Sequence, residues 1–455
     1  MTTKTVQALI DSRPLSGFQI RTIFLCGLVV LLDGFDTLAI GYVAPFLVKE
    51  WHLSKAALGP VFASSLLGLM VGALVFGPAA DRWGRRPVLI ASTVLFSVLT
   101  LLTTAAYDLQ SMVVLRFLTG LGLGGAMPNA IALTSEYAPS RLRASAVTVM
   151  FCGFSLGGAI GGILAAKLIG AYGWHAVFIV GGLAPALLAG WLLLSLPESM
   201  RYLSTRGNGE ALVNVYLQRI GVPPRLHDGA VARPEPRADS SAVAALFKEG
   251  RAGFTVLLWL MFFMSLFEIF FISNWMPTVF NGIGVPLQQS LLITALFPIG
   301  GTVGTLVLGW LLDRHSPYKV IAVAYGLACA SVLALGLVSP TSWALLSVAS
   351  FVGGFFSVGA QVGTNALAAQ AYPTAIRSTG VGWALGIGRG GSLLSALGSG
   401  WLITLGVTPF QTFLIAAVPI GIAAVAAVAI HVRWHGQLNG PAELRTHGTE
   451  VLNSA

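Results

Sequence analysis

The chain has 455 residues, of which 55% are hydrophobic and only 9% are charged, and its mean hydropathy is +0.81. A soluble domain carries about a quarter charged residues, so this composition excludes an ordinary soluble protein. The formal net charge of +9 would suggest nucleic-acid binding in a soluble protein, but the basic residues are placed as in a membrane protein.

Twelve apolar runs follow one another, and each approaches the roughly 20 residues that a membrane-spanning helix needs. The first run begins after Arg21 and is too long for the apolar part of a signal peptide, so we expect it to remain as a span. This pattern predicts an all-α membrane protein with twelve transmembrane helices. The predicted spans are 21–45, 57–80, 88–107, 111–134, 144–169, 175–196, 254–281, 289–312, 319–339, 342–367, 379–405 and 410–433.

A polar stretch rich in proline and in mixed charge interrupts the series of short loops, which is typical of a linker. It divides the chain into two halves of six spans each. The predicted parts are an N-terminal six-helix bundle at 1–196, a cytoplasmic linker at 197–253, a C-terminal six-helix bundle at 254–433 and a cytoplasmic tail at 434–455.

Lysine and arginine gather in alternate loops. They occur at the N-terminus, after the second, fourth, eighth and tenth spans, in the linker and at the C-terminus, whereas the other loops hold little beyond Lys49 and Lys55. With twelve spans the basic segments fall on one side, so the positive-inside rule predicts that both termini are cytoplasmic. The basic surplus therefore indicates topology, and no nucleic-acid partner is predicted.

The two halves align with each other at a shift of 232 or 233 residues. Such a parallel repeat is typical of transporters that hold their substrate at the membrane midplane, between the halves. The matching positions are Gly77 with Gly309, Asp81 and Arg82 with Asp313 and Arg314, Asp36 and Pro45 with Glu268 and Pro277, and Gly157 and Gly158 with Gly390 and Gly391.

The segment from Gly77 to Arg86 has the sequence G-P-A-A-D-R-W-G-R-R. It resembles the signature G-x-x-x-D-R-x-G-R-R/K between the second and third spans of the major facilitator superfamily, and this resemblance covers essentially the whole chain. A tight turn there would let Asp81 pair with a cation or with the positive end of a helix. A latch that opens in one transporter state is therefore predicted, with a solvated topogenic loop as the alternative. The latch candidates are Gly77, Asp81, Arg82, Gly84, Arg85 and Arg86, with a weaker copy at Asp313 and Arg314.

A narrower resemblance lies in the first span, where residues 32–37 have the sequence L-D-G-F-D-T. This segment is similar to the aromatic acid:proton symporters, as are residues 10–15, 116–125 and 274–277. The resemblance implies uptake of benzoate-like acids, such as hydroxybenzoates and protocatechuate, driven by protons across a bacterial inner membrane.

Three carboxylates lie deep in the predicted spans: Asp33, Asp36 and Glu268. A charge at the bilayer centre costs about 2.5–3.5 kcal/mol on insertion scales, so such residues are rare and usually functional. Asp33 and Asp36 share a helix face, and desolvation and mutual repulsion favour their neutral forms, as a proton carrier requires. All three are predicted proton-coupling residues, and we expect Asp36 and Glu268 to face the central cavity from opposite halves. The alternative for each is a structural contact with a neighbouring helix.

Two arginines also lie inside the spans, and the fork of donors on either one suits a substrate carboxylate. Arg389 interrupts a glycine-rich run, and Arg116 offers the same chemistry. An intramembrane ion pair with Asp33 or Asp36 is the alternative. Aromatic rings can stack on a flat substrate and amides can bind ring hydroxyls, unless they serve packing or interhelical hydrogen bonds. The other substrate-site candidates are Phe35, Tyr42, Asn129, Phe267, Phe271, Asn274, Gln361, Asn365 and Trp383.

Other functions are less favoured by the sequence. An antiporter signature in the fifth span ends G-P-x-x-G-G, and here Gly158 stands where that proline belongs, which favours symport. The chain contains no H-E-x-x-H, P-loop or metal-ligand cluster, so we expect no enzyme activity, cofactor or metal. Uptake of an aliphatic (di)carboxylate and efflux by proton antiport remain the alternatives. The protein is expected to work as a monomer in the bilayer.

Overall fold

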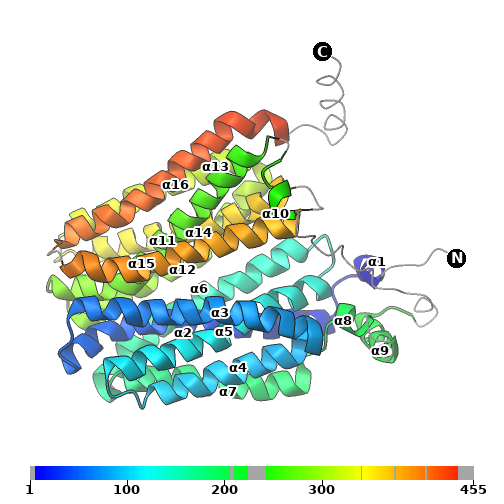
Figure 1. Ribbon diagram of the computed structural model, residues 1–455, viewed down its shortest axis with the longest axis horizontal. Helices are drawn as coiled ribbons and strands as arrows, with labels where there is room; N and C mark the ends of the chain where they lie inside the picture. Colours follow the sequence, from blue (N-terminus) through cyan, green and yellow to red (C-terminus); the bar gives the residue numbers. More distant parts are fainter. Residues whose placement is uncertain are drawn as a thin grey trace.

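The computed structural model describes residues 6–204, 210–223, 242–248, 250–339, 341–372, 376–404 and 407–438, in which every regular element is a helix. Twelve long helices form two bundles (Figure 1). The N-terminal bundle contains α2 (Gly17–Glu50), α3 (Leu58–Trp83), α4 (Arg85–Thr103), α5 (Leu109–Tyr137), α6 (Arg143–Tyr172) and α7 (His175–Ser195). The C-terminal bundle contains α11 (Ala252–Gly282), α12 (Leu287–Arg314), α13 (Pro317–Leu337), α14 (Trp343–Ala371), α15 (Arg377–Thr404) and α16 (Pro409–Leu438).

Five short helices lie outside the bundles' long helices. They are α1 (Val6–Asp11), the 3-10 helix η1 (Lys55–Ala57), α8 (Met200–Ser204), α9 (Glu210–Ile220) and α10 (Ala242–Ala245). Three of them fall in the segment that the sequence identified as a linker. Most of the remaining linker, and the tail beyond residue 438, lies outside the described residues.

The predicted all-helical fold with two six-helix bundles is confirmed. Eleven long helices in the described part are long and apolar enough to cross a membrane. The twelfth, α15, coincides with the predicted span 379–405 and carries Arg389 and a run of glycines. Several helices extend beyond their predicted spans because polar residues cap them outside the apolar stretch. In α2 the Ser16 hydroxyl accepts a hydrogen bond from the Gln19 backbone N–H, 3.3 Å away, which closes a capping box.

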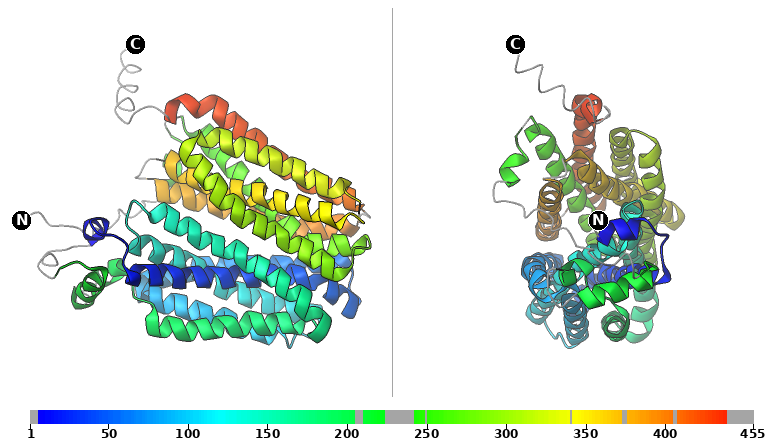
Figure 2. Two further views of the ribbon diagram at one scale, coloured as in Figure 1. Left: turned by 180° about the vertical axis from the view of Figure 1, so that it is seen from behind. Right: turned by 90° about the vertical axis from the view of Figure 1, so that its right-hand side faces the viewer.

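The two bundles repeat the same packing. In the N-terminal half α3 packs on α5, α2 on α6 and α4 on α7, and in the C-terminal half α12 packs on α14, α11 on α15 and α13 on α16. These pairs are equivalent under the sequence repeat. The halves meet where α6 contacts α12, α3 contacts α15 and α2 contacts α11. The end-on view in Figure 2 shows the bundles side by side, one blue to green and the other green to red.

Glycines allow the closest of these helix contacts. A Cβ on Gly157 of α6 would overlap the Leu31 carbonyl oxygen of α2, and a Cβ on Gly391 of α15 would overlap the Phe263 carbonyl oxygen of α11. Small residues at such positions let two helix backbones approach. Each glycine therefore allows a close contact between the first and fifth long helices of its half, although the repeat aligns Gly157 with Gly390.

Hydrophobic clusters join the halves at one end only. We call the end that carries α1, α9 and the last turns of α16 the α1 end (Figure 1). At the opposite end a single cluster contains residues of both halves, and Phe62 packs edge-on against Trp275 with ring centroids 5.4 Å apart. At the α1 end each half has its own cluster. The halves are thus packed together at the opposite end and have separate cores at the α1 end.

Candidate functional site

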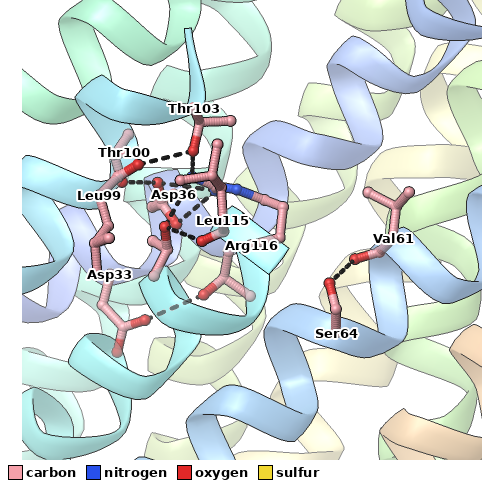
Figure 3. Close-up of polar contacts among 11 residues, drawn as sticks. Asp33, Asp36, Val61, Ser64, Leu99, Thr100, Thr103, Leu115 and Arg116 are labelled. Carbon is pink, nitrogen blue, oxygen red and sulfur yellow. Dashed lines mark hydrogen bonds and ion pairs between the residues drawn. The ribbon is translucent and has the colours of Figure 1, made fainter. Parts of the chain in front are cut away.

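The N-terminal half contains a fully buried ion pair. Arg116 Nη1 on α5 lies 3.1 Å from Asp36 Oδ2 on α2, and neither side chain is exposed. Thr100 donates a hydrogen bond to Asp36 Oδ1 at 2.7 Å, and Arg116 Nη2 donates to Thr103 at 2.7 Å and to Thr119 at 3.1 Å. Figure 3 shows this cluster between α2, α4 and α5. Of the two roles considered for Arg116, this structure contains the ion pair.

Asp33 lies one turn before Asp36 on α2, outside that cluster (Figure 3). Its Oδ1 accepts a hydrogen bond from the Thr37 hydroxyl at 3.1 Å. Its Oδ2 is buried and has no hydrogen-bond partner among the described residues. The two aspartates therefore have different surroundings: Asp36 points into its own bundle, and Asp33 keeps one oxygen unpaired.

Arg389 on α15 is partly buried. It faces the N-terminal half, where its Nη2 lies 4.0 Å from the Met127 sulfur of α5. It interacts electrostatically with Asp33, but within the described ranges it has no carboxylate at ion-pair distance. A guanidinium in this situation can bind an anion that enters between the halves.

Glu268 on α11 occupies the repeat position of Asp36, but among the described residues it has no cation at ion-pair distance. It is fully buried, and Ser357 of α14 donates a hydrogen bond to its Oε1 at 3.1 Å. Its Oε2 has no partner in the described part of the chain. Around it, Ser265 and Tyr325 both donate hydrogen bonds to Gln361 Oε1, the second at 3.5 Å. The hydrogen bond that holds Glu268 thus comes from a neutral group of its own half.

The predicted polar substrate residues are engaged mainly with nearby groups. Tyr42 donates a hydrogen bond to the Gly158 carbonyl at 3.0 Å, and Asn129 donates to the carbonyl one turn before it at 2.7 Å. Gln361 Nε2 donates to Asn365 Oδ1 at 3.4 Å. Asn274 is buried where α2 and α11 cross closely at Gly41. None of these residues lines the cavity between the halves that is described below.

The predicted aromatic residues also pack against other rings or helices. Phe267 and Phe271 stack on each other with centroids 6.1 Å apart, and Trp383 stacks on Trp259 at 5.8 Å. Phe35 is buried between α2, α6 and α7. Trp383 is 46% exposed, so it alone of this set leaves a large ring face accessible.

A cavity of about 50 Å³ lies between the two halves. Residues of α2 and α6 line it from one side, and residues of α11, α12 and α14 from the other. None of its nine lining residues is among the sequence-derived candidates, and they include Phe154, Ser155, Phe270 and Ser273. Their positions in the sequence could have indicated the two serines, because Ser155 lies just before the repeated glycines and Ser273 directly precedes the segment 274–277.

Two glutamates that the sequence did not identify hold the predicted latch segment. Arg85 forms an ion pair with Glu136 of α5, and Glu198 Oε1 accepts hydrogen bonds from the backbone N–H groups of Arg85 and Arg86 at 2.9 and 3.1 Å. The turn needs Gly84, whose φ of 104° is costly for other residues. The sequence pattern specified the turn, but its partners come from α5 and from the connection between α7 and α8, far away in the sequence.

The other predicted latch residues make fewer contacts. Asp81 is exposed, and we find no hydrogen bond or ion pair from it to the described residues. The Arg82 carbonyl accepts a hydrogen bond from Tyr202 at 3.4 Å, and Gly77 has open space beside it. In the second copy, Arg314 lies over the Trp310 ring at 4.2 Å. The side chain of Asp313 lies outside the described residues.

Two repeated six-helix bundles that contain buried charges and enclose a cavity between them define a membrane transporter rather than an enzyme. The family model described as Major Facilitator Superfamily matches residues 26–291 and 258–447. The chain belongs to this family.

Curated relatives span nearly its whole length. The 4-hydroxybenzoate transporter PcaK of Pseudomonas putida is 42% identical over 93% of this chain and 95% of that protein. The gallate transporter of Pseudomonas putida is 41% identical over 95% of this chain and 96% of that protein. The benzoate transport protein of Acinetobacter baylyi is 33% identical over 94% of this chain and 93% of that protein. These findings confirm the resemblance to aromatic acid transporters of the major facilitator type.

Solved structures agree on the fold. A bacterial homologue of the human lysosomal transporter Spinster, in an inward-facing conformation, matches with a TM-score of 0.70 at 16% identity, over 94% of this chain and 99% of that one. A D-xylose–proton symporter matches with a TM-score of 0.67 at 20% identity, over 90% of this chain and 96% of that one.

Proposed function

We propose that the protein takes up an aromatic carboxylate of the benzoate, hydroxybenzoate or protocatechuate type by proton symport through alternating access. The observation that carries this proposal is Arg389, a cation beside the half interface with no carboxylate within ion-pair distance in the described residues. Its planar fork of donors matches a carboxylate. The relatives named for 4-hydroxybenzoate, gallate and benzoate support an aromatic acid as the anion.

Asp33 provides the proposed link between anion and proton. While Asp33 is ionised, its charge partly compensates Arg389, with which it interacts electrostatically. Once Asp33 takes up a proton, Arg389 lacks this compensation and attracts the substrate carboxylate more strongly. One proton and one anion then bind together. Glu268 is a second proton site, whereas Asp36 participates only if its pair with Arg116 opens during the cycle.

The proposed setting is a bacterial inner membrane with both termini in the cytoplasm, as the loop charges predict. The α1 end would then face the cytoplasm, and the shared hydrophobic cluster would close the periplasmic side. In the outward-open state the separate cores at the α1 end approach each other, and Asp81, which has no hydrogen bond or ion pair to the described residues in this state, becomes available as a latch.

Reconstituted uptake tests this function. Purified protein in liposomes is given labelled benzoate, 4-hydroxybenzoate, protocatechuate or succinate, with and without an inward proton gradient. We expect only the aromatic acids to accumulate, and only with the gradient. Accumulation of succinate alone, or accumulation that ignores the gradient, would overturn the proposal.

Two variants test the assigned roles. Arg389→Gln should weaken substrate binding by at least about tenfold, because it removes a charge-assisted bidentate contact. Its control is Arg433→Gln, at an exposed arginine that lies over the Trp434 ring. Asp33→Asn should abolish gradient-driven accumulation but keep exchange of substrate across the membrane. Normal uphill uptake by that variant would exclude Asp33 as the proton carrier.

A further inference from the structure

The cavity between the halves contains two hydroxyl groups that have no described partner. Ser155 on α6 and Ser273 on α11 line it from opposite halves and are 8% and 6% exposed. Within the described part of the chain we find no hydrogen bond from either hydroxyl. Many other hydroxyls in these helices donate to a nearby backbone carbonyl, as Thr93 does to Leu89 at 2.8 Å and Ser64 to Val61 at 2.8 Å (Figure 3).

The rest of the cavity wall is apolar and aromatic. Leu38 and Phe154 contribute from the N-terminal half, and Phe270 and Phe297 from the C-terminal half. A concave apolar site with a few placed polar groups is the usual form of a small-molecule subsite. Rings in the wall can pack against the face or edge of another ring. The chemistry fits a hydroxylated aromatic edge better than an aliphatic chain.

The size of the cavity indicates how much of a substrate it admits. Its volume of about 50 Å³ is well below the roughly 150 Å³ of a cavity known to hold benzene. In this state it therefore takes the far edge of a ring, and the carboxylate remains outside it. Leu38 follows Asp33 by five residues on α2, which corresponds to about 7.5 Å along the helix axis. A single benzene ring with groups at opposite positions bridges a separation of this order.

We propose that Ser155 and Ser273 form the subsite that binds the ring hydroxyl of the substrate, one serine from each half, while Arg389 holds the carboxylate. This subsite rests on the proposed uptake of an aromatic carboxylate and adds its specificity: the protein prefers hydroxylated benzoates to benzoate. Because the serines belong to different halves, a bound ring hydroxyl also connects the halves at the level where they close.

Replacing each serine by alanine tests the subsite. Initial uptake rates into proteoliposomes are measured for 4-hydroxybenzoate, 3-hydroxybenzoate and benzoate, and kcat/KM for each hydroxylated acid is divided by kcat/KM for benzoate. Since this ratio does not depend on the amount of folded protein, a partly unstable variant still gives an answer. We expect Ser155→Ala and Ser273→Ala each to lower it about threefold to tenfold for at least one hydroxylated acid, as for the loss of one hydrogen bond.

Ser64→Ala is the matched control. Ser64 is 5% exposed, is bonded to its own helix and lies outside this cavity, so its removal should leave the ratio unchanged. A wild-type protein that carries aromatic acids without preferring hydroxylated ones would overturn the subsite. So would ratios unchanged within about twofold in both serine variants. If the wild type accumulates no aromatic acid at all, the proposed function itself fails.

Discussion

The N-terminal half and the C-terminal half place a buried carboxylate at the same repeat position but surround it differently. Asp36 lies 3.1 Å from Arg116 and accepts a further hydrogen bond from Thr100. Glu268 has a hydrogen bond from Ser357, and its second oxygen has no partner in the described residues. One half therefore contains a compensated charge, and the other an acid without a cation beside it.

This difference separates two uses of a buried acid. An ion pair inside a bundle keeps its charges because removing either partner leaves the other buried and uncompensated. A lone acid in an apolar interior is most stable when neutral, and it changes its charge when water or a cation reaches it. The first arrangement suits a fixed framework, and the second suits exchange of protons.

The largest effect should come from breaking the compensated pair. Arg116→Leu leaves Asp36 buried without a cation, which we expect to lower the free energy of unfolding by about 3–5 kcal/mol. Thermal unfolding of the purified protein in detergent measures this loss. The double variant Asp36→Asn/Arg116→Leu should recover most of the stability because no charge remains.

The control for this prediction is Arg389→Leu. Arg389 is an intramembrane arginine too, but no ion pair within the described residues depends on it, so the unfolding temperature should stay close to that of the wild type. Equal destabilisation by Arg116→Leu and Arg389→Leu would remove the distinction between a structural and a substrate-binding arginine.

The glycine contacts test whether the halves are equivalent in packing even though their charges differ. Gly157→Ala and Gly391→Ala place a methyl group against a carbonyl oxygen of the neighbouring helix, and we expect each to cost about 1–3 kcal/mol. Gly386→Ala on the same helix as Gly391 meets open space and should be neutral or slightly stabilising. Thermal unfolding of the three variants shows whether one half tolerates the methyl better than the other.

Glu268→Gln sharpens the comparison at the lone acid. The amide keeps the size of the side chain and can still accept the hydrogen bond from Ser357, so we expect a change in stability below about 1 kcal/mol. Gradient-driven accumulation should fall about tenfold or more if Glu268 exchanges protons. Asp36→Asn should instead affect stability more than uptake. We expect a clear loss of stability because Arg116 is then unpaired. Comparing unfolding temperature and uptake for the two variants tests this separation directly.

These effects also show how far the sequence could predict the site. Hydropathy predicted the long helices, and the repeat predicted that Asp36 and Glu268 occupy equivalent positions, because both signals recur along the chain. The partner of each charge could not be predicted in the same way. Whether Arg116 pairs with Asp33 or Asp36 depends on how α2 and α5 rotate against each other, which no local pattern specifies.

The same limit applies to the residues that the sequence did not identify. Glu136 and Glu198 lie near helix ends, where an acidic residue is ordinary, and only the fold brings them to Arg85. Ser155 and Ser273 are small residues within glycine-rich or aromatic segments. Their shared cavity exists only because α2 and α6 of one half meet α11 and α12 of the other.

The smallest effect should lie at the α1 end, where the N-terminal segment holds the loop between α5 and α6. Asp11 accepts hydrogen bonds from the Ser140 backbone N–H at 2.6 Å, from the Ser140 hydroxyl at 2.8 Å and from Gln7 at 3.0 Å. Partial burial opposes its ionisation. The hydrogen bonds from Ser140 and Gln7, with the charge of Arg143, outweigh that cost and hold the pKa of Asp11 below its usual value.

The lowered pKa of Asp11 determines how stability changes with pH. A pKa that is lower in the folded state contributes stability that is complete above the unfolded value, near 3.8, and is lost as the pH falls through the folded value. Asp11→Asn should therefore weaken the attachment of α1 by about 1 kcal/mol at neutral pH, and the difference from the wild type should shrink below about pH 4. Amide hydrogen exchange of residues 6–11 at pH 7 and pH 5, corrected for the intrinsic rate at each pH, and thermal unfolding extended to pH 3.5 measure this difference. A difference that grows in acid would mean that Asp11 is stabilised in its protonated form, and the attachment would then not depend on its charge.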